Sequence, residues 1–126
     1  EKAIAAIDDI SVYVFLYPLE DIHPDANRKA RMIWCSSDRA RAWDRFMLQG
    51  ELPPAGNVDC PTPIADVAKL GQLLGIRSTP GIVLEDGSVI PGAVPADALE
   101  QRIKRASASV KAANSVGRKD QNSLPR

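Results

Sequence analysis

The run Ser11–Tyr17, with the sequence SVYVFLY, restricts the fold of this chain more than any other segment. Its β-branched, aromatic and aliphatic residues predict a β-strand. Because nearly every residue in it is apolar, we expect both faces of this strand to be buried, as in the inner layer of an α/β protein. The chain has 126 residues, which is enough for one domain with a single core.

Helical patterns precede and follow this strand. Residues 1–8 resemble the last turns of a helix, and four more helices are predicted around residues 25–35, 38–49, 63–74 and 95–106. Trp34, Trp43, Phe46 and Met47 are expected in the core, although an exposed aromatic patch is an alternative. A strand followed by a long helical crossover is typical of α/β layers.

A hairpin is predicted where Asp86-Gly87 separates two short apolar runs. Gly81–Glu85 and Ser88–Ile90 flank this dipeptide. Asp-Gly between apolar runs is the strongest short signal for a β-hairpin. We therefore expect an antiparallel pair at one edge of the sheet.

Charge is balanced over the whole chain but not along it. The 16 basic and 16 acidic residues cancel, which argues against a nucleic-acid-binding domain. Residues 102–126 hold seven basic residues and one acid, so this part carries +6 and residues 1–101 carry −6. We predict a domain over residues 1–106 and a basic, disordered tail over residues 107–126. The apolar runs are too short for a membrane helix.

Cys35 and Cys60 are the only cysteines, and two interpretations of them stay open. They either form a structural disulfide or remain two free thiols. With the single histidine, His23, they are too few for a zinc site without carboxylates, so no metal is expected. The acidic residues near His23 lack the spacing of a calcium loop and are expected to be solvated.

Several motifs, in their order along the chain, resemble one family. The motifs are RMIWC, DRARAWDRFM, NVDC and LGQLLGIRSTPGIVLEDGSVIPG. From Glu1 to Ala106 the chain is similar to the thioredoxin-like domain of the DsbC/DsbG group of thiol:disulfide isomerases and oxidoreductases. The resemblance implies an α/β fold, with a mixed sheet flanked by helices. It also implies that Thr79-Pro80 is a cis-proline loop that docks substrate, and that Cys35 and Cys60 form a non-catalytic disulfide.

The chain departs from this family at its catalytic motif. The family's C-x-x-C is absent, so we expect it upstream of Glu1 and expect no catalytic residue within this chain. The fold would then be incomplete at its N-terminus. Without its neighbours the Ser11–Tyr17 strand would be unstable or would recruit a strand from another chain. The alternative is a redox-inactive, peptide-binding or chaperone-like module.

The resemblance also implies the surroundings in which the protein works. We expect misfolded or disulfide-bonded proteins as substrates, a possible redox partner, a periplasmic location and no cofactor. Neither nucleic acid nor membrane is expected as a partner. Dimerisation is expected only through an N-terminal region that lies outside this chain.

Overall fold

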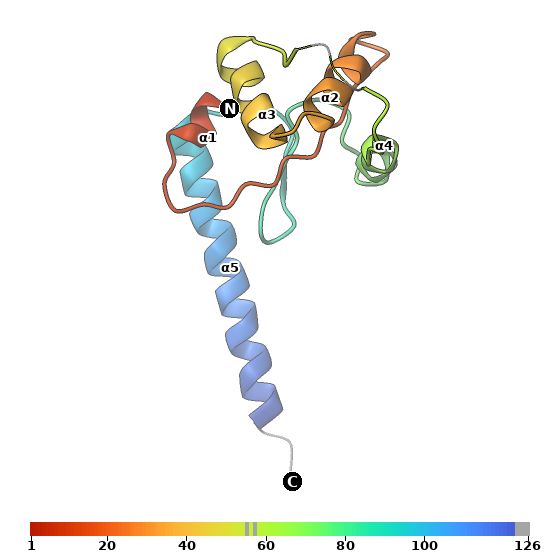
Figure 1. Cartoon of the computed structure of the whole chain (residues 1–126). Coiled ribbons are helices and arrows are strands. Elements are labelled where there is room, and N and C mark those ends of the chain that lie inside the picture. The colour runs from red at the N-terminus through yellow and green to blue at the C-terminus, as the bar shows by residue number, and fades with distance from the viewer. Residues whose placement is uncertain (55, 57, 123–126) are drawn as a thin grey trace. The chain divides into compact units, whose positions relative to one another are not determined.

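The computed structural model describes residues 1–54, 56 and 58–122, which form two compact units (Figure 1). The first unit covers Glu1–Thr79 and the second Pro80–Arg126. The first contains four helices: α1 (Lys2–Ala5), α2 (Ala26–Trp34), α3 (Arg39–Gln49) and α4 (Ile64–Leu73). The second contains strands β1 (Ile82–Val83) and β2 (Val89–Ile90) and helix α5 (Ala96–Asn122).

The predicted helices of the first unit are confirmed, and local chemistry explains their ends. At the start of α3, the carboxylate of Asp38 accepts a hydrogen bond from the amide of Arg41 at 3.1 Å. This bond satisfies one of the amides that every helix leaves unpaired at its N-terminus. The same helix ends at Gly50, whose φ of 72° lies in the left-handed region that glycine tolerates best.

The core of the first unit is small and lies where α2 packs against α3. Its buried apolar residues are Ile7, Ala30, Met32, Ile33, Ala42 and Ile64. Trp34, Trp43 and Phe46 are only half-buried, and Met47 is exposed, which corrects the prediction that all four lie in the core. Large aromatic side chains therefore lie at the margin of this core.

The predicted strand at Ser11–Tyr17 does not form, and this is the main correction to the sequence-based fold. The residues make no hydrogen-bonded ladder, and Tyr13 and Phe15 are 82% and 64% exposed instead of buried. The sheet within the described residues is the antiparallel pair β1–β2, smaller than the mixed sheet that we expected. A strand needs a partner for its backbone groups, and no described segment pairs with Ser11–Tyr17.

The predicted hairpin is confirmed. Ile82 pairs with Ile90 and Val83 with Val89. In the turn, Asp86 accepts hydrogen bonds from the amide of Ser88 at 3.0 Å and from its hydroxyl at 2.6 Å. These bonds to the carboxylate hold the pKa of Asp86 below its usual range.

Helix α5 is longer than the sequence indicated. Residues 107–122, which we expected to be disordered, continue the helix without a break (Figure 1). The segment 107–122 contains no proline, so nothing in it blocks a helix outright, although most of its residues are Ser, Val, Asn, Asp and Gly, which are weak helix formers. The expected end of the basic tail, residues 123–126, lies outside the described residues, and the domain boundary at 106 stays a prediction.

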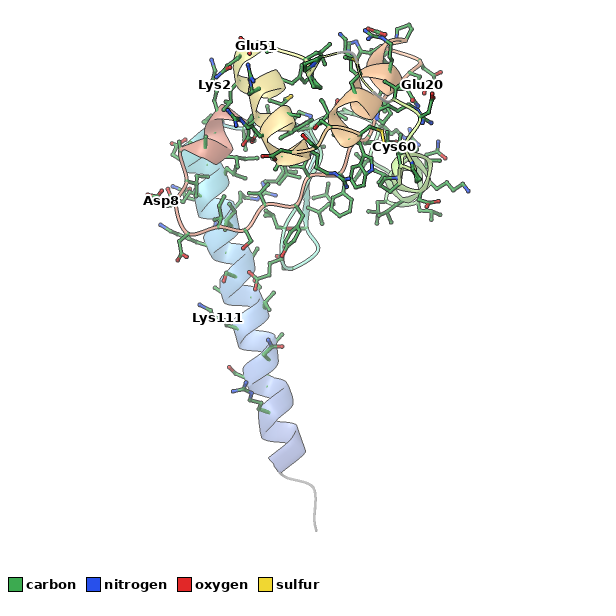
Figure 2. The ribbon with its side chains drawn as sticks, viewed as in Figure 1. Lys2, Asp8, Glu20, Glu51, Cys60 and Lys111 are labelled. Carbon is green, nitrogen blue, oxygen red and sulfur yellow. A yellow bond between two sulfur atoms is a disulfide. The ribbon has the colours of Figure 1, made fainter. Side chains whose placement is uncertain are left out.

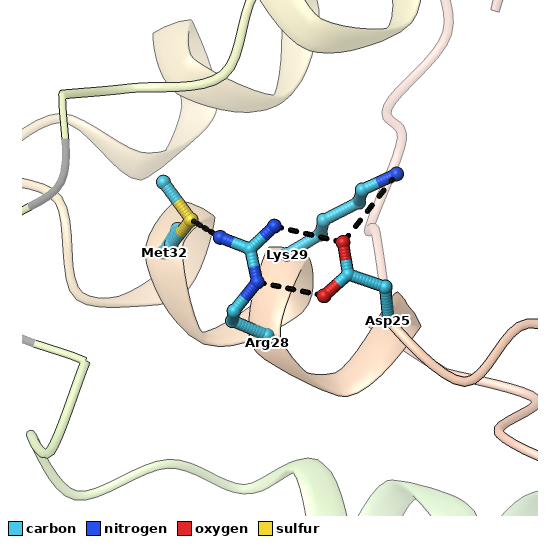
Figure 3. Close-up of polar contacts among 4 residues, drawn as sticks. All are labelled: Asp25, Arg28, Lys29 and Met32. Atoms are coloured by element: carbon cyan, nitrogen blue, oxygen red, sulfur yellow. Dashed lines mark hydrogen bonds and ion pairs between the residues drawn. The ribbon is translucent and has the colours of Figure 1, made fainter.

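The first turn of α2 carries a compact ionic cluster (Figure 3). Both carboxylate oxygens of Asp25 accept hydrogen bonds from the guanidinium of Arg28 at 2.7 Å, and Lys29 lies 3.9 Å away. Arg28 also donates to the sulfur of Met32 at 3.1 Å. The hydrogen bonds from Arg28 are the main reason why the pKa of Asp25 lies below its usual value.

This lowered pKa predicts an acid-dependent loss of stability. A carboxylate with a lower pKa in the folded state stabilises the fold above its unfolded pKa of about 3.9 and loses that effect as pH falls through its folded pKa. Wild-type protein should therefore lose more unfolding free energy between about pH 5 and pH 2 than Asp25→Asn. Urea unfolding across this range measures it. Asp21→Asn is the control, because Asp21 makes no hydrogen bond or ion pair with a described residue; equal slopes for wild type and Asp25→Asn would contradict the prediction.

Candidate functional site

The two cysteines form a disulfide within the first unit. Cys35 follows the last residue of α2, and Cys60 lies in the loop before α4, where Figure 2 labels it. Their Cα atoms are 5.8 Å apart, and they are separated by 25 positions in the sequence. No free cysteine remains, so the alternative of two free thiols does not describe this structure. The bond ties the end of one helix to the approach to another.

Trp34 reinforces the same connection. Its indole nitrogen donates a hydrogen bond to the carbonyl of Pro61 at 3.1 Å, directly beside the disulfide. The guanidinium of Arg39 lies 3.9 Å from the centre of the indole ring. A cation over the face of a tryptophan at an exposed site contributes about 0.5–1 kcal/mol. Together these contacts join the end of α2, the start of α3 and the loop before α4.

An apolar hollow of about 490 Å³ opens between this region and the unpaired segment 12–16. Ile33, Trp34 and Trp43 line it, and charged groups of both signs, among them Arg39 and Asp44, stand in its wall. A smaller hollow of about 150 Å³ shares Val14, Phe15, Leu16 and Trp34 with it and reaches Ile64 on α4. Both hollows belong to the first unit. Apolar side chains of segment 12–16, which pairs with no described strand, form part of the lining of each.

Tyr17 anchors the end of the unpaired segment to α4. Its hydroxyl donates a hydrogen bond to the carbonyl of Ile76 at 3.0 Å. Its ring packs against Gly71, where an added Cβ would lie 2.7 Å from the nearest ring carbon. The sequence analysis missed this contact, because a glycine inside a helical pattern gives no indication of which side chain approaches it.

The predicted docking residues lie at the boundary of the two units. Thr79 ends the first unit and Pro80 begins the second, and both are exposed in a bend of the backbone. Thr79 makes no hydrogen bond or ion pair with a described residue. Ile76 is three residues before Thr79, so the Tyr17 hydroxyl holds the chain just ahead of this bend. No contact that the structure describes brings Thr79 to the disulfide.

Other candidate ligands remain dispersed. His23 is exposed, and within the described residues no three histidine, cysteine or acidic side chains gather closely enough to hold a metal ion. Among those residues, no helix has the length and apolarity needed to cross a membrane.

Residues 1–107 match the family model described as a thioredoxin-like domain. The chain belongs to this family. Among solved structures, it is similar to the crystal structure of a disulfide interchange protein from Neisseria gonorrhoeae, with a TM-score of 0.79 and 36% identity. That similarity covers 83% of this chain and 74% of the other. The thioredoxin-like fold predicted from the motifs is therefore confirmed.

Curated relatives of this thioredoxin-like chain carry one name. This chain is 39% identical over 102 residues to the probable thiol:disulfide interchange protein DsbC of Bordetella parapertussis. The matched region covers 81% of this chain and 35% of that protein. The chain is 35% identical over 86 residues to the thiol:disulfide interchange protein DsbC of Escherichia coli, covering 68% of this chain and 35% of that protein. The chain thus spans about a third of the length of these relatives.

Loss of the disulfide should destabilise this thioredoxin-like chain without abolishing its secondary structure. The loop-closure model gives about 3.5 kcal/mol for a separation of 25 residues. The double variant Cys35→Ser/Cys60→Ser should lose about this much unfolding free energy in urea. Reduced wild-type protein is the control and should unfold with the double variant. An unfolding midpoint equal to that of the oxidised wild type would contradict a stabilising role.

Two helical glycines give a matched test of the Tyr17 contact. Gly→Ala inside a helix normally stabilises it by up to about 1 kcal/mol. Gly71→Ala should instead destabilise the protein, because the new methyl group meets the ring of Tyr17. Gly117→Ala in α5 should follow the normal rule, because nothing lies within 4 Å of its added Cβ. Thermal unfolding measures both changes, and stabilisation by Gly71→Ala would show that Tyr17 does not occupy this position.

Proposed function

We propose that this chain is part of a thiol:disulfide isomerase or oxidoreductase, in which it supplies the substrate-docking loop and a structural disulfide. The observation that carries the proposal is the similarity to DsbC proteins over most of the chain, at 35–39% identity. The proposal assigns no catalytic step of the full-length relatives to a residue of this chain. The docking role is assigned to Thr79 and Pro80, which match the loop motif.

The chemistry limits what this chain contributes to exchange. Disulfide exchange begins when a thiolate attacks a disulfide sulfur, so it needs a free cysteine. The two cysteines of this chain are bonded to each other, and their 25-residue separation does not form a C-x-x-C pair. In the proposed function the reacting dithiol therefore lies outside these 126 residues, and this chain presents the substrate to it.

Backbone groups carry the proposed docking. An extended peptide that runs beside Thr79 can pair with its amide and carbonyl, as strands pair in a sheet. Thr79 is exposed, and its backbone makes no hydrogen bond to a described residue, so these groups are free to accept a partner. The substrates would be disulfide-bonded or misfolded proteins. The disulfide itself suits an oxidising compartment, and we place the protein in the periplasm.

A second candidate is a redox-inactive module that binds peptides. The bonded state of both cysteines favours it. The two candidates share the docking loop and differ in whether the natural protein carries a further dithiol. Intact-mass analysis of the protein from its source, with and without reduction and alkylation, distinguishes them. Two thiols beyond Cys35 and Cys60 support the oxidoreductase, and their absence supports the binding module.

The docking role predicts a specific response at Thr79. An extended peptide containing a blocked cysteine should shift the backbone amide NMR signals of Ser78, Thr79 and Gly81 more than those elsewhere. Thr79→Pro removes the amide donor and should abolish the shifts, whereas Thr79→Ser keeps the donor and should retain them. Far-UV circular dichroism controls for folding of both variants. Shifts that persist in Thr79→Pro, or that map to another region, would contradict docking at this loop.

A further inference from the structure

Tyr17 reaches across 59 positions of the sequence to the stretch of chain that leads into Thr79. The hydrogen bond from its hydroxyl to the carbonyl of Ile76 is partly buried. Ile76 itself is half-buried, whereas Arg77, Ser78 and Thr79 are exposed. A hydrogen bond shielded from water is stronger than one on the open surface. The Tyr17 hydroxyl therefore fixes the point from which the exposed docking loop starts.

The end of helix α4 holds Ile76 by its other backbone group. The amide of Ile76 donates to the carbonyl of Gly71 at 2.9 Å. The amide of Gly75 donates to the carbonyl of Gln72 at 3.1 Å, and Gly75 has a φ of 70°. These two bonds and the left-handed residue make up a Schellman motif, which ends a helix in a defined direction. Ile76 is thus tied at its amide by α4 and at its carbonyl by Tyr17.

Gly71 makes both of these contacts possible. It offers its carbonyl to Ile76, and its missing side chain leaves room for the ring of Tyr17. An added Cβ would lie 2.7 Å from the ring carbon that bears the hydroxyl. A larger residue at this position would therefore displace the hydroxyl together with the ring. We call these three residues, Tyr17, Gly71 and Ile76, the tyrosine clamp.

We propose that Tyr17 is a positioning residue for peptide docking, which holds Thr79 through Ile76 in the orientation that pairs with a substrate. The inference rests on the docking function proposed above and adds a residue that the loop motif does not contain. Among the residues that the structure describes, Ile76 makes the last backbone hydrogen bonds before Thr79. A loop fixed three residues away has fewer conformations to lose when a peptide binds, so it binds more tightly.

Removal of the hydroxyl tests this role, because Tyr17→Phe keeps the ring and loses only the hydrogen bond. The affinity of the 126-residue chain for the extended peptide with a blocked cysteine should fall about three- to tenfold, as expected for one lost hydrogen bond. In the free protein, NMR relaxation should give lower backbone order parameters for Ser78 and Thr79, with those of α3 unchanged. Gly71→Ala displaces the same hydroxyl from the other side and should have both effects.

Asp38→Ala is the matched control, because it removes a hydrogen bond within α3 and leaves the tyrosine clamp in place. It should lower the free energy of unfolding and still bind the peptide as tightly as wild type. An equal loss of affinity in Asp38→Ala would show a general effect of stability and overturn the proposal.

The remaining outcomes separate this inference from the proposed function. Wild-type affinity or unchanged order parameters in Tyr17→Phe would overturn the positioning role alone, and docking at Thr79 would stand. A wild-type protein that binds no peptide at Thr79 would overturn the proposed function, and the positioning role with it.

Discussion

The Cys35–Cys60 disulfide is the constraint on which the first unit depends most. The buried residues of this unit are few and mostly small or medium in size, so apolar burial gives it a limited core. The covalent bond joins the end of α2 to the loop before α4, and the Trp34–Pro61 hydrogen bond lies beside it. Small domains with thin cores commonly gain stability from such bonds, because the unfolded chain loses conformational freedom.

Much of this architecture follows from the sequence because its signals are local. Asp38, Gly50 and Asp86-Gly87 each act on neighbouring backbone groups, so the ends of α3 and the hairpin could be predicted. The end of α5 was underestimated because the serines, asparagines and glycine after Ala106 are weak helix formers and suggested disorder, whereas the helix continues through them in the absence of a proline. The prediction of a strand at Ser11–Tyr17 was wrong for a different reason. Its composition indicates a strand, but composition does not reveal whether a partner is present.

The candidate site was predictable only where a motif carries it. Thr79 and Pro80 are predicted as docking residues from the family resemblance, since local patterns in the sequence assign them no docking role. The contact of Tyr17 with Gly71 and Ile76 joins residues that are far apart in the sequence, so it needed coordinates. The two cysteines are bonded to each other, so they link parts of the fold and leave no thiolate that could attack a substrate disulfide.

The positions of the two tryptophans allow their fluorescence to report on the first unit. Both indoles of the chain lie in this unit, and both line the larger hollow. Trp34 immediately precedes Cys35 in the sequence, and the Arg39 guanidinium lies over its ring. The indole nitrogen of Trp43 instead donates a hydrogen bond to the Glu1 carboxylate at 3.2 Å. Because the Trp34 indole donates its hydrogen bond to the carbonyl of Pro61, the residue after Cys60, opening the disulfide frees the loop that holds this indole, and tryptophan fluorescence offers a readout of that change.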